Sequence, residues 1–265
     1  MSTINTNTKS LNVQRNLAGS ANALATSMSR LSSGLRVNSA KDDAAGMAIA
    51  ERMSAQTRGM NVAIRNANDA IGLAATADGA LGAISNNLQR MRELAVQASN
   101  GTNSSSDITA LNSEFTALVA ENTRVTSATK FNGNAVIAAT TFVFQVGANT
   151  GDTISVTGVA PTLSSTTLGA STTTANAELA KLDTDIDAVN TARATWGATQ
   201  NRFDSVVANL RVGAENSAAA RGRIMDADYA QETASLSRAQ VLQQAGTAMV
   251  AQANQAPQGV LALLR

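Results

Sequence analysis

An unbroken stripe of apolar residues between residues 60 and 98 limits the fold more than any other feature of this sequence. Its members recur at alternating spacings of three and four residues, which places them on one face of an α-helix. Most of them are small, and small side chains suit a narrow seam between helices better than a thick core. We therefore expect a single helix over residues 44–99, about 84 Å long at about 1.5 Å per residue. The stripe consists of Met60, Ala63, Ala67, Ala70, Ala74, Ala77, Leu81, Ile84, Leu88, Met91, Ala95 and Ala98.

A separate helix is predicted before this one. Ser39, Asp42 and Asp43 provide the acceptors and negative charge that favour a helix start, so the long helix should begin near Ala44. The earlier helix carries its own apolar stripe, which consists of Leu17, Ala21, Leu24, Met28, Leu31 and Leu35.

The middle of the chain predicts a third helix and a hairpin. The sequence NGTNSSSD is typical of a loop that ends in a helix cap. In the stripe that follows, Asn122 is the one polar member, and a buried Asn can fix the register of a seam. Its apolar members are Ile108, Leu111, Phe115, Leu118 and Val125. KFNGN then indicates a turn, and TFVFQV and TISV predict a small hairpin across ANTGD.

The rest of the chain predicts a connection and further helix. Residues 161–174 are almost wholly Ser, Thr, Gly, Ala and Leu, which indicates a surface connection. A further apolar stripe runs from Leu179 to Leu210 and is interrupted by the polar residues Arg193 and Gln200. A helix is expected to continue from Ile224 to Leu264. The acidic residues Asp183, Asp185 and Asp187 are interpreted as a solvated helix face. The stripe consists of Leu179, Leu182, Ile186, Val189, Trp196, Phe203, Val207 and Leu210.

Composition excludes several classes of function. The chain has no Cys and no His, so most hydrolase and redox mechanisms, disulfides and transition-metal sites are disfavoured. No phosphate-binding or calcium-binding loop is found, and Asp42 and Asp43 are better explained as helix caps than as a catalytic pair. We therefore expect neither an enzyme nor a cofactor.

Charge is balanced overall but uneven along the chain. The net charge of +1 and the few aromatic residues disfavour a nucleic-acid partner. Residues 1–41 contain five basic residues and no acidic one, which fits either a solvated helix face or a partner surface. Residues 239–264 are uncharged, but Gln and Asn interrupt them too often for a membrane-spanning helix. The N-terminus has no apolar segment typical of a cleaved secretory signal, so export would need another route.

Several collinear segments together resemble bacterial flagellins over nearly the whole chain. They are RLSSGLRVNSAKDDAAGMAIAERM at 30–53, QRMRELAVQASNGTNS at 89–104, FNG at 131–133, QVGAN at 145–149, QNRFDS at 200–205, and the run from RIMDADYAQETASLSRAQ to the end.

The resemblance implies a mainly α fold: a rod of long helices with a small β-hairpin, and both termini paired as an inner-core coiled coil. It implies inner-core helices at 1–43 and 225–265, outer-core rod helices and hairpin at 44–175, and an outer-core C-terminal helix at 176–224. Large outer domains are expected to be missing. The residues expected to serve inner-core assembly are Leu17, Leu24, Met28, Leu31, Leu35, Leu242 and Met249.

The implied function is a structural subunit that polymerises into the extracellular flagellar filament for motility. Export would use the flagellar type III apparatus, and partners would include an export chaperone, the filament cap and hook–filament junction proteins. A junction protein of the same machinery is the alternative function. A zinc-peptidase insert, which some flagellins carry, would require His, and a membrane-active helical protein is the least favoured class.

The resemblance also implies recognition by host receptors. The family's contacts with Toll-like receptor 5 correspond to Gln89, Arg90, Leu94, Gln97 and Glu114, and the leucines sensed by cytosolic inflammasome receptors correspond to Leu261, Leu263 and Leu264. Helix geometry turns the residues at 90, 93, 94 and 97 away from the seam. We expect Arg90 and Glu93 to pair weakly, and Leu94 to be covered by a neighbouring subunit. A role in subunit contacts alone stays open for this segment.

Overall fold

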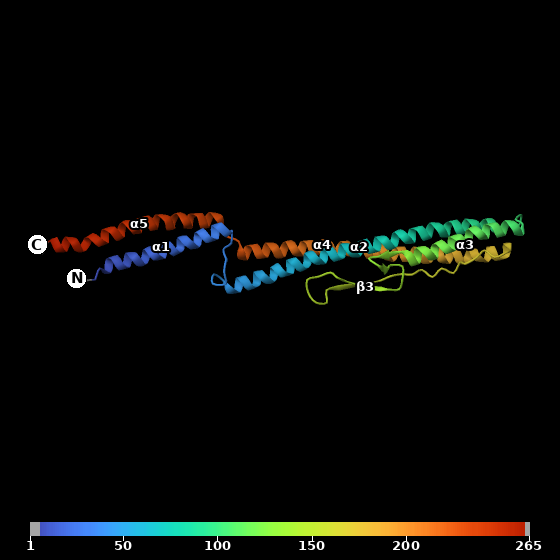
Figure 1. Ribbon diagram of the computed structural model, residues 1–265, viewed down its shortest axis with the longest axis horizontal. Helices are drawn as coiled ribbons and strands as arrows, with labels where there is room; N and C mark the ends of the chain where they lie inside the picture. Colours follow the sequence, from blue (N-terminus) through green and yellow to red (C-terminus); the bar gives the residue numbers. More distant parts are fainter. Residues whose placement is uncertain (1–5, 263–265) are drawn as a thin grey trace. The chain divides into compact units, whose positions relative to one another are not determined.

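The computed structural model describes residues 6–262, and side chains as far as residue 255. Within that range the chain is mainly α-helical, with short antiparallel strands, as expected (Figure 1). It forms two compact units, called here the terminal unit, Met1–Ala55 with Asn216–Arg265, and the central unit, Gln56–Glu215. The elements are α1 (Thr8–Ser33), α2 (Ala44–Ala98), α3 (Ser105–Ala128), β1 (Lys130–Phe131), β2 (Asn134–Ala135), β3 (Thr141–Gln145), β4 (Thr153–Thr157), α4 (Thr172–Met225) and α5 (Tyr229–Ala262).

Side-chain caps are present at the starts of α2 and α3, the two helices for which the sequence predicted them. At the start of α2, the Asp43 Oδ1 atom accepts a hydrogen bond of 2.8 Å from the backbone N–H of Gly46. At the start of α3, Ser104 and Asp107 form a reciprocal capping box. Such bonds satisfy amide groups that the first helical turn leaves without partners. The predicted start of α2 near Ala44 is confirmed.

In the terminal unit, α1 and α5 run side by side in opposite directions (Figure 1). Near one end of the pair, the Asn7 Nδ2 atom donates a hydrogen bond of 2.8 Å to the carbonyl oxygen of Ala253. Near the other end, the Arg30 guanidinium lies 3.7 Å from a Glu232 carboxylate oxygen. Between them, a Cβ atom added at Gly246 would lie 3.0 Å from Leu17 Cδ1, so the two helices approach closely at that glycine.

Two predictions for the terminal unit are wrong. Leu35 lies outside the first helix, because α1 ends at Ser33 and Gly34 caps it with φ +72°. The last helix is not continuous from residue 224, because α4 ends at Met225 and α5 begins at Tyr229. The physical reason is shared: the Arg36 N–H donates to the Met225 carbonyl oxygen at 2.6 Å, and the N–H at residue 227 donates to the Gly34 carbonyl oxygen at 2.9 Å. Pairing between these two segments replaces helical hydrogen bonds.

The central unit is built on the predicted stripe of α2. Its alanines from position 67 onward are buried together with larger side chains from α3, α4 and the β region. The predicted polar member of the α3 stripe, Asn122, is also buried, and its Oδ1 atom accepts a hydrogen bond of 2.8 Å from Asn87 Nδ2 on α2. The largest fully buried side chains are Trp196, Phe115, Phe203, Leu81, Ile84, Leu88, Met91, Leu94, Leu168, Leu182, Val136 and Val189.

The predicted hairpin is present and packs onto the helices. Strands β3 and β4 pair antiparallel, with Phe144 opposite Ile154. The rings of Phe144 and Phe203 meet edge to face, with centroids 5.5 Å apart, which joins the hairpin to α4. A second, shorter pair, β1 and β2, turns at Asn132 and Gly133, both with positive φ. Asn-Gly favours such a turn because glycine adopts positive φ without steric cost.

The segment between β4 and α4 is not the plain surface connection that its composition predicted. Ser165 and Leu168 are buried. The carboxylate of Asp185 accepts hydrogen bonds of 2.9 Å from the backbone N–H groups of Ser164 and Ser165, and another of 2.9 Å from the Ser164 hydroxyl. The interpretation of Asp185 as part of a solvated face is therefore wrong, since this side chain is only 1% exposed and secures the connection.

Candidate functional site

An ordered ionic cluster lies on the central unit where α2 meets α3. The guanidinium of Arg90 donates hydrogen bonds of 2.9 Å to both Glu93 and Glu114. The hydrogen bond that Arg90 donates to Glu93, together with the one that it donates to Glu114, raises the pKa of Arg90 above its usual value. The predicted pairing of Arg90 with Glu93 is confirmed, and the contact with Glu114 adds a bridge between two helices.

This cluster keeps a large surface open to solvent. The side chains of Arg90 and Glu114 are 49% and 47% exposed, and Gln89 and Gln97 are exposed beside them. Because Arg90 is paired with two carboxylates, the cluster carries a net negative charge. The neutral amides of Gln89 and Gln97 do not alter it. Such a surface can bind a partner through charged and amide hydrogen bonds.

The expected position of Leu94 is wrong. The side chain is 1% exposed and belongs to the hydrophobic core of the central unit. The buried face of α2 is wider here than the predicted apolar stripe, since Leu94 is buried together with the stripe members Met91 and Ala95. The chain itself covers Leu94, so no neighbouring subunit is needed to shield it from water.

The second candidate surface is the outer face of the α1–α5 pair in the terminal unit. Of the residues expected to serve assembly, Leu17, Leu24 and Leu31 are half-buried within the unit. Met28, Leu242 and Met249 are 58%, 51% and 59% exposed. Leu35 is half-buried in a separate small cluster with Val37 and Met225. Leu11 and Val241 add to the exposed apolar side chains of the pair.

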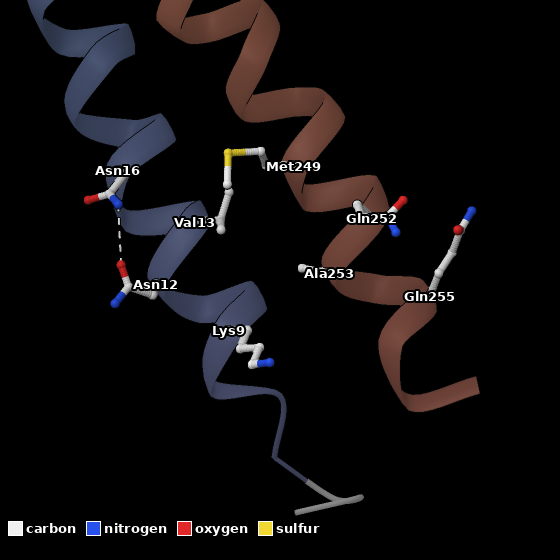
Figure 2. Close-up of a pocket in the computed structure, with 8 residues that line it drawn as sticks. All are labelled: Lys9, Asn12, Val13, Asn16, Met249, Gln252, Ala253 and Gln255. Carbon is white, nitrogen blue, oxygen red and sulfur yellow. Dashed lines mark hydrogen bonds between the residues drawn. The ribbon is translucent and has the colours of Figure 1, made fainter. Parts of the chain in front are cut away.

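A groove of about 800 Å³ opens between α1 and α5 toward the N-terminal end of α1 (Figure 2). From α5, Met249 reaches toward Val13 on α1, and amide and amine groups surround the rest of the opening. The groove therefore combines an apolar floor with a polar rim. Its lining residues are Lys9, Asn12, Val13, Asn16, Met249, Gln252, Ala253 and Gln255.

Some predicted features fall beyond what the structure describes. The side chain of Leu261, and Leu263 and Leu264 entirely, lie outside the described residues. Within the described part of the chain, no cluster of three or more potential metal ligands is found. Over the same range, none of the helices combines the length and hydropathy that crossing a membrane requires.

Comparisons with known proteins identify the family. The bacterial flagellin N-terminal helical region matches residues 4–141, and the bacterial flagellin C-terminal helical region matches residues 179–264. The chain belongs to the bacterial flagellin family. Members of this family are the structural subunits of the extracellular flagellar filament, a homopolymer. The chain is therefore a structural protein rather than an enzyme.

Individual relatives match over almost their full length. A flagellin of Halalkalibacterium halodurans is 45% identical over 270 residues, covering 99% of each chain. A flagellin of Xenorhabdus nematophila is 42% identical over 313 residues, covering 100% of this chain and 99% of the relative. Among solved structures, the crystal structure of Bacillus cereus flagellin has 38% identity and a TM-score of 0.51, and covers 55% of this chain and 88% of that one.

Sequence reasoning missed the polar contacts that join distant elements. Arg193 on α4 donates a hydrogen bond of 2.8 Å to Asp78 on α2, and Arg92 on α2 donates one of 2.7 Å to Asp183 on α4. The intrusion of Arg193 into an apolar stripe was a signal that it has a partner, but nothing along the chain identified that partner.

Proposed function

We propose that the outer face of the α1–α5 pair joins this subunit to neighbouring copies in the flagellar filament. The observation that carries the proposal is the group of large apolar side chains left exposed there: Leu11, Met28, Val241, Leu242 and Met249. Burying apolar surface stabilises an interface by about 25 cal/mol per Å². Apolar side chains that stay exposed on a pair of packed helices are available for contact with a neighbouring copy.

Seeded elongation tests this proposal. Purified subunit is added to short filament fragments, and growth is followed by electron microscopy. A chain lacking residues 239–265 should keep the helical circular-dichroism signal of the central unit but should not elongate the seeds, because it lacks all three α5 members of the exposed apolar group. Normal filaments grown from the truncated chain would refute the proposed role of this face.

The same experiment separates the filament subunit from the alternative, a hook–filament junction protein. A filament subunit adds to its own newly formed end, so growth continues as long as subunit is supplied. A junction protein adds a short segment and stops. The match over 99% of a relative named flagellin favours the filament subunit.

We also propose that the free subunit is recognised by Toll-like receptor 5 through the Arg90 cluster. The proposal rests on the family resemblance and on the open, ordered arrangement of Arg90 and Glu114. Gln89 and Gln97 would make direct contacts beside them, whereas Leu94 would support the surface from beneath. Hydrogen bonds to charged groups contribute about 1.5–3 kcal/mol each.

A pair of arginine variants tests the receptor proposal. Arg90→Ala should weaken signalling by the monomer in receptor-bearing cells by about tenfold or more. The matched control is Arg124→Ala, since Arg124 is also exposed and paired with a carboxylate, that of Glu121 on α3. Equal signalling by the two variants would contradict the assignment.

We infer export through the flagellar type III apparatus, with a chaperone and a filament cap as partners, from the family resemblance alone. Recognition of Leu261, Leu263 and Leu264 by cytosolic inflammasome sensors has the same basis. Cells without the apparatus should retain the subunit inside, and its appearance in their medium would exclude this export route.

A further inference from the structure

Methionine is the most readily oxidised side chain in this protein. The sequence has eight methionines, no cysteine and no histidine. Its one tryptophan, Trp196, is buried. Among the described methionines, only Met28 and Met249 are exposed, whereas Met91 and Met225 are buried in the two units. Exposure governs access of an oxidant to a thioether.

Both exposed sulfurs lie on the surface proposed for assembly. Met28 directly follows Ser27, which is buried in the α1–α5 pair, so a turn of about 100° per residue carries Met28 away from the partner helix. Met249 stands at the groove between the helices, with its sulfur toward α1 (Figure 2). No large apolar residue encloses either side chain in the free subunit, since both remain more than half exposed.

We propose that Met28 and Met249 form an oxidation-sensitive modification site that controls whether the subunit can assemble, an inference that rests on the proposed function of the α1–α5 face. The reagent is hydrogen peroxide. A lone pair of the Met Sδ atom attacks one peroxide oxygen, an S–O bond forms, the O–O bond breaks, and water leaves. The sulfide loses two electrons to the peroxide. A methionine sulfoxide reductase, which draws its electrons from thiols, reverses the change.

The consequence differs between the free subunit and the filament. In the free subunit, water can hydrate a sulfoxide at either position, and the Gln252 and Gln255 amides can donate hydrogen bonds to one at Met249. In an apolar contact with another copy, the sulfoxide oxygen would lose those hydrogen bonds, and an unpaired buried polar group is costly. Oxidation therefore opposes assembly without unfolding the central unit, which contains neither residue. The filament in turn shields both sulfurs.

The test compares subunit treated with hydrogen peroxide before and after polymerisation. Peptide mass spectrometry should find one added oxygen at Met28 and Met249 in the treated free subunit, with Met91 unmodified. Treated subunit should elongate seeds about tenfold more slowly than untreated subunit, with an unchanged helical circular-dichroism signal. Filaments exposed to the same dose should show less oxidation at both positions.

A variant carrying Met28→Leu and Met249→Leu provides the matched control, because leucine keeps apolar volume but has no sulfur. Its elongation rate after peroxide should equal its own rate before peroxide. Two results would overturn the inference: wild-type subunit oxidised at both positions that elongates at its untreated rate, or a variant that loses as much of its rate as the wild type does. Failure of untreated wild-type subunit to elongate at all would instead contradict the proposed function of the face.

Discussion

At the scale of single residues, burial decides what a charged or apolar side chain does. Asp185 and Asp183 lie two positions apart on α4. Asp183 pairs with Arg92 at the surface, whereas the Asp185 carboxylate is enclosed and accepts hydrogen bonds from the connection before α4. Glu178, which precedes Asp185 on α4, is also buried. Its carboxylate accepts a hydrogen bond of 3.0 Å from the backbone N–H of Thr166. Two buried carboxylates thus hold a segment whose composition alone indicates a surface connection.

Asp185→Asn should lower the free energy of unfolding by about 1–3 kcal/mol, because a neutral amide leaves donors of the connection without acceptors. Denaturant unfolding measures the loss, and limited proteolysis should cut the connection between residues 158 and 171 sooner. The exposed Asp183→Asn is the control and should cost about 1 kcal/mol or less. Similar losses in both variants would show that burial of Asp185 has no special role.

Leu94→Ala should lower the free energy of unfolding by about 2–5 kcal/mol, since it leaves a cavity in the core of the central unit. Thermal unfolding followed by circular dichroism measures the change. Val96→Ala, two positions along the same helix and exposed, should change stability by about 0.5 kcal/mol or less. If the two variants unfold alike, Leu94 is not enclosed by its own chain.

At the scale of elements, short polar segments decide where the long helices begin. The hydrogen bond from the Ser104 hydroxyl, and then that from its backbone N–H, lower the pKa of the Asp107 carboxyl. The Ser39 hydroxyl, followed by the backbone N–H groups of residues 38 and 39, lowers the pKa of Asp42 in the same way. Each loop therefore favours the ionised carboxylate beside a helix start, where negative charge also suits the helix dipole.

The lowered pKa of Asp107 predicts the sign of a pH effect. The folded-state pKa lies below the unfolded value of about 3.9, so the ionised group stabilises the fold above that pH. This contribution should disappear as pH falls through the folded-state pKa. Wild type should therefore be more stable than Asp107→Asn near neutral pH, with the difference shrinking below about pH 4. Ser104→Ala, which removes the main cause, should flatten this dependence in denaturant titrations; an unaltered slope would contradict the assignment.

At the scale of the whole molecule, the two units differ in how they satisfy their apolar residues. The central unit encloses Trp196, Phe115 and Phe203 within its own chain. The terminal unit leaves Val241 and Leu242 exposed on a helix that already has a partner. This contrast fits a subunit that folds one unit alone and completes the other by polymerisation.

Replacing both Val241 and Leu242 by Ser should slow seeded elongation by about tenfold or more, because it removes apolar surface that neighbouring copies would bury. The thermal unfolding of the central unit should not change. Gln240→Ser, a polar exposed position on the same helix, provides the control and should elongate seeds at the wild-type rate. Equal rates for both variants would place the subunit contacts elsewhere.

Local pattern was sufficient to predict most of the elements. The spacing of alanine and leucine predicted α2, Asp43 and the loop NGTNSSSD predicted helix starts, and Asn-Gly with flanking β-branched residues predicted turns and a hairpin. These features depend on neighbours within a few residues, so the sequence contains them directly. The collinear segments likewise predicted the family that the comparisons identified.

The tertiary structure decided what depends on residues far apart in the chain. It turned Leu94 inward, gave Arg90 its partner Glu114, buried Asp185 under the connection, and ended α4 where residues 34–37 pair with it. Periodicity fixes which residues share a helix face, but it does not fix how wide a face the neighbouring elements cover. That width is set only when the helices pack, because burial and hydrogen-bond partners are properties of several segments together.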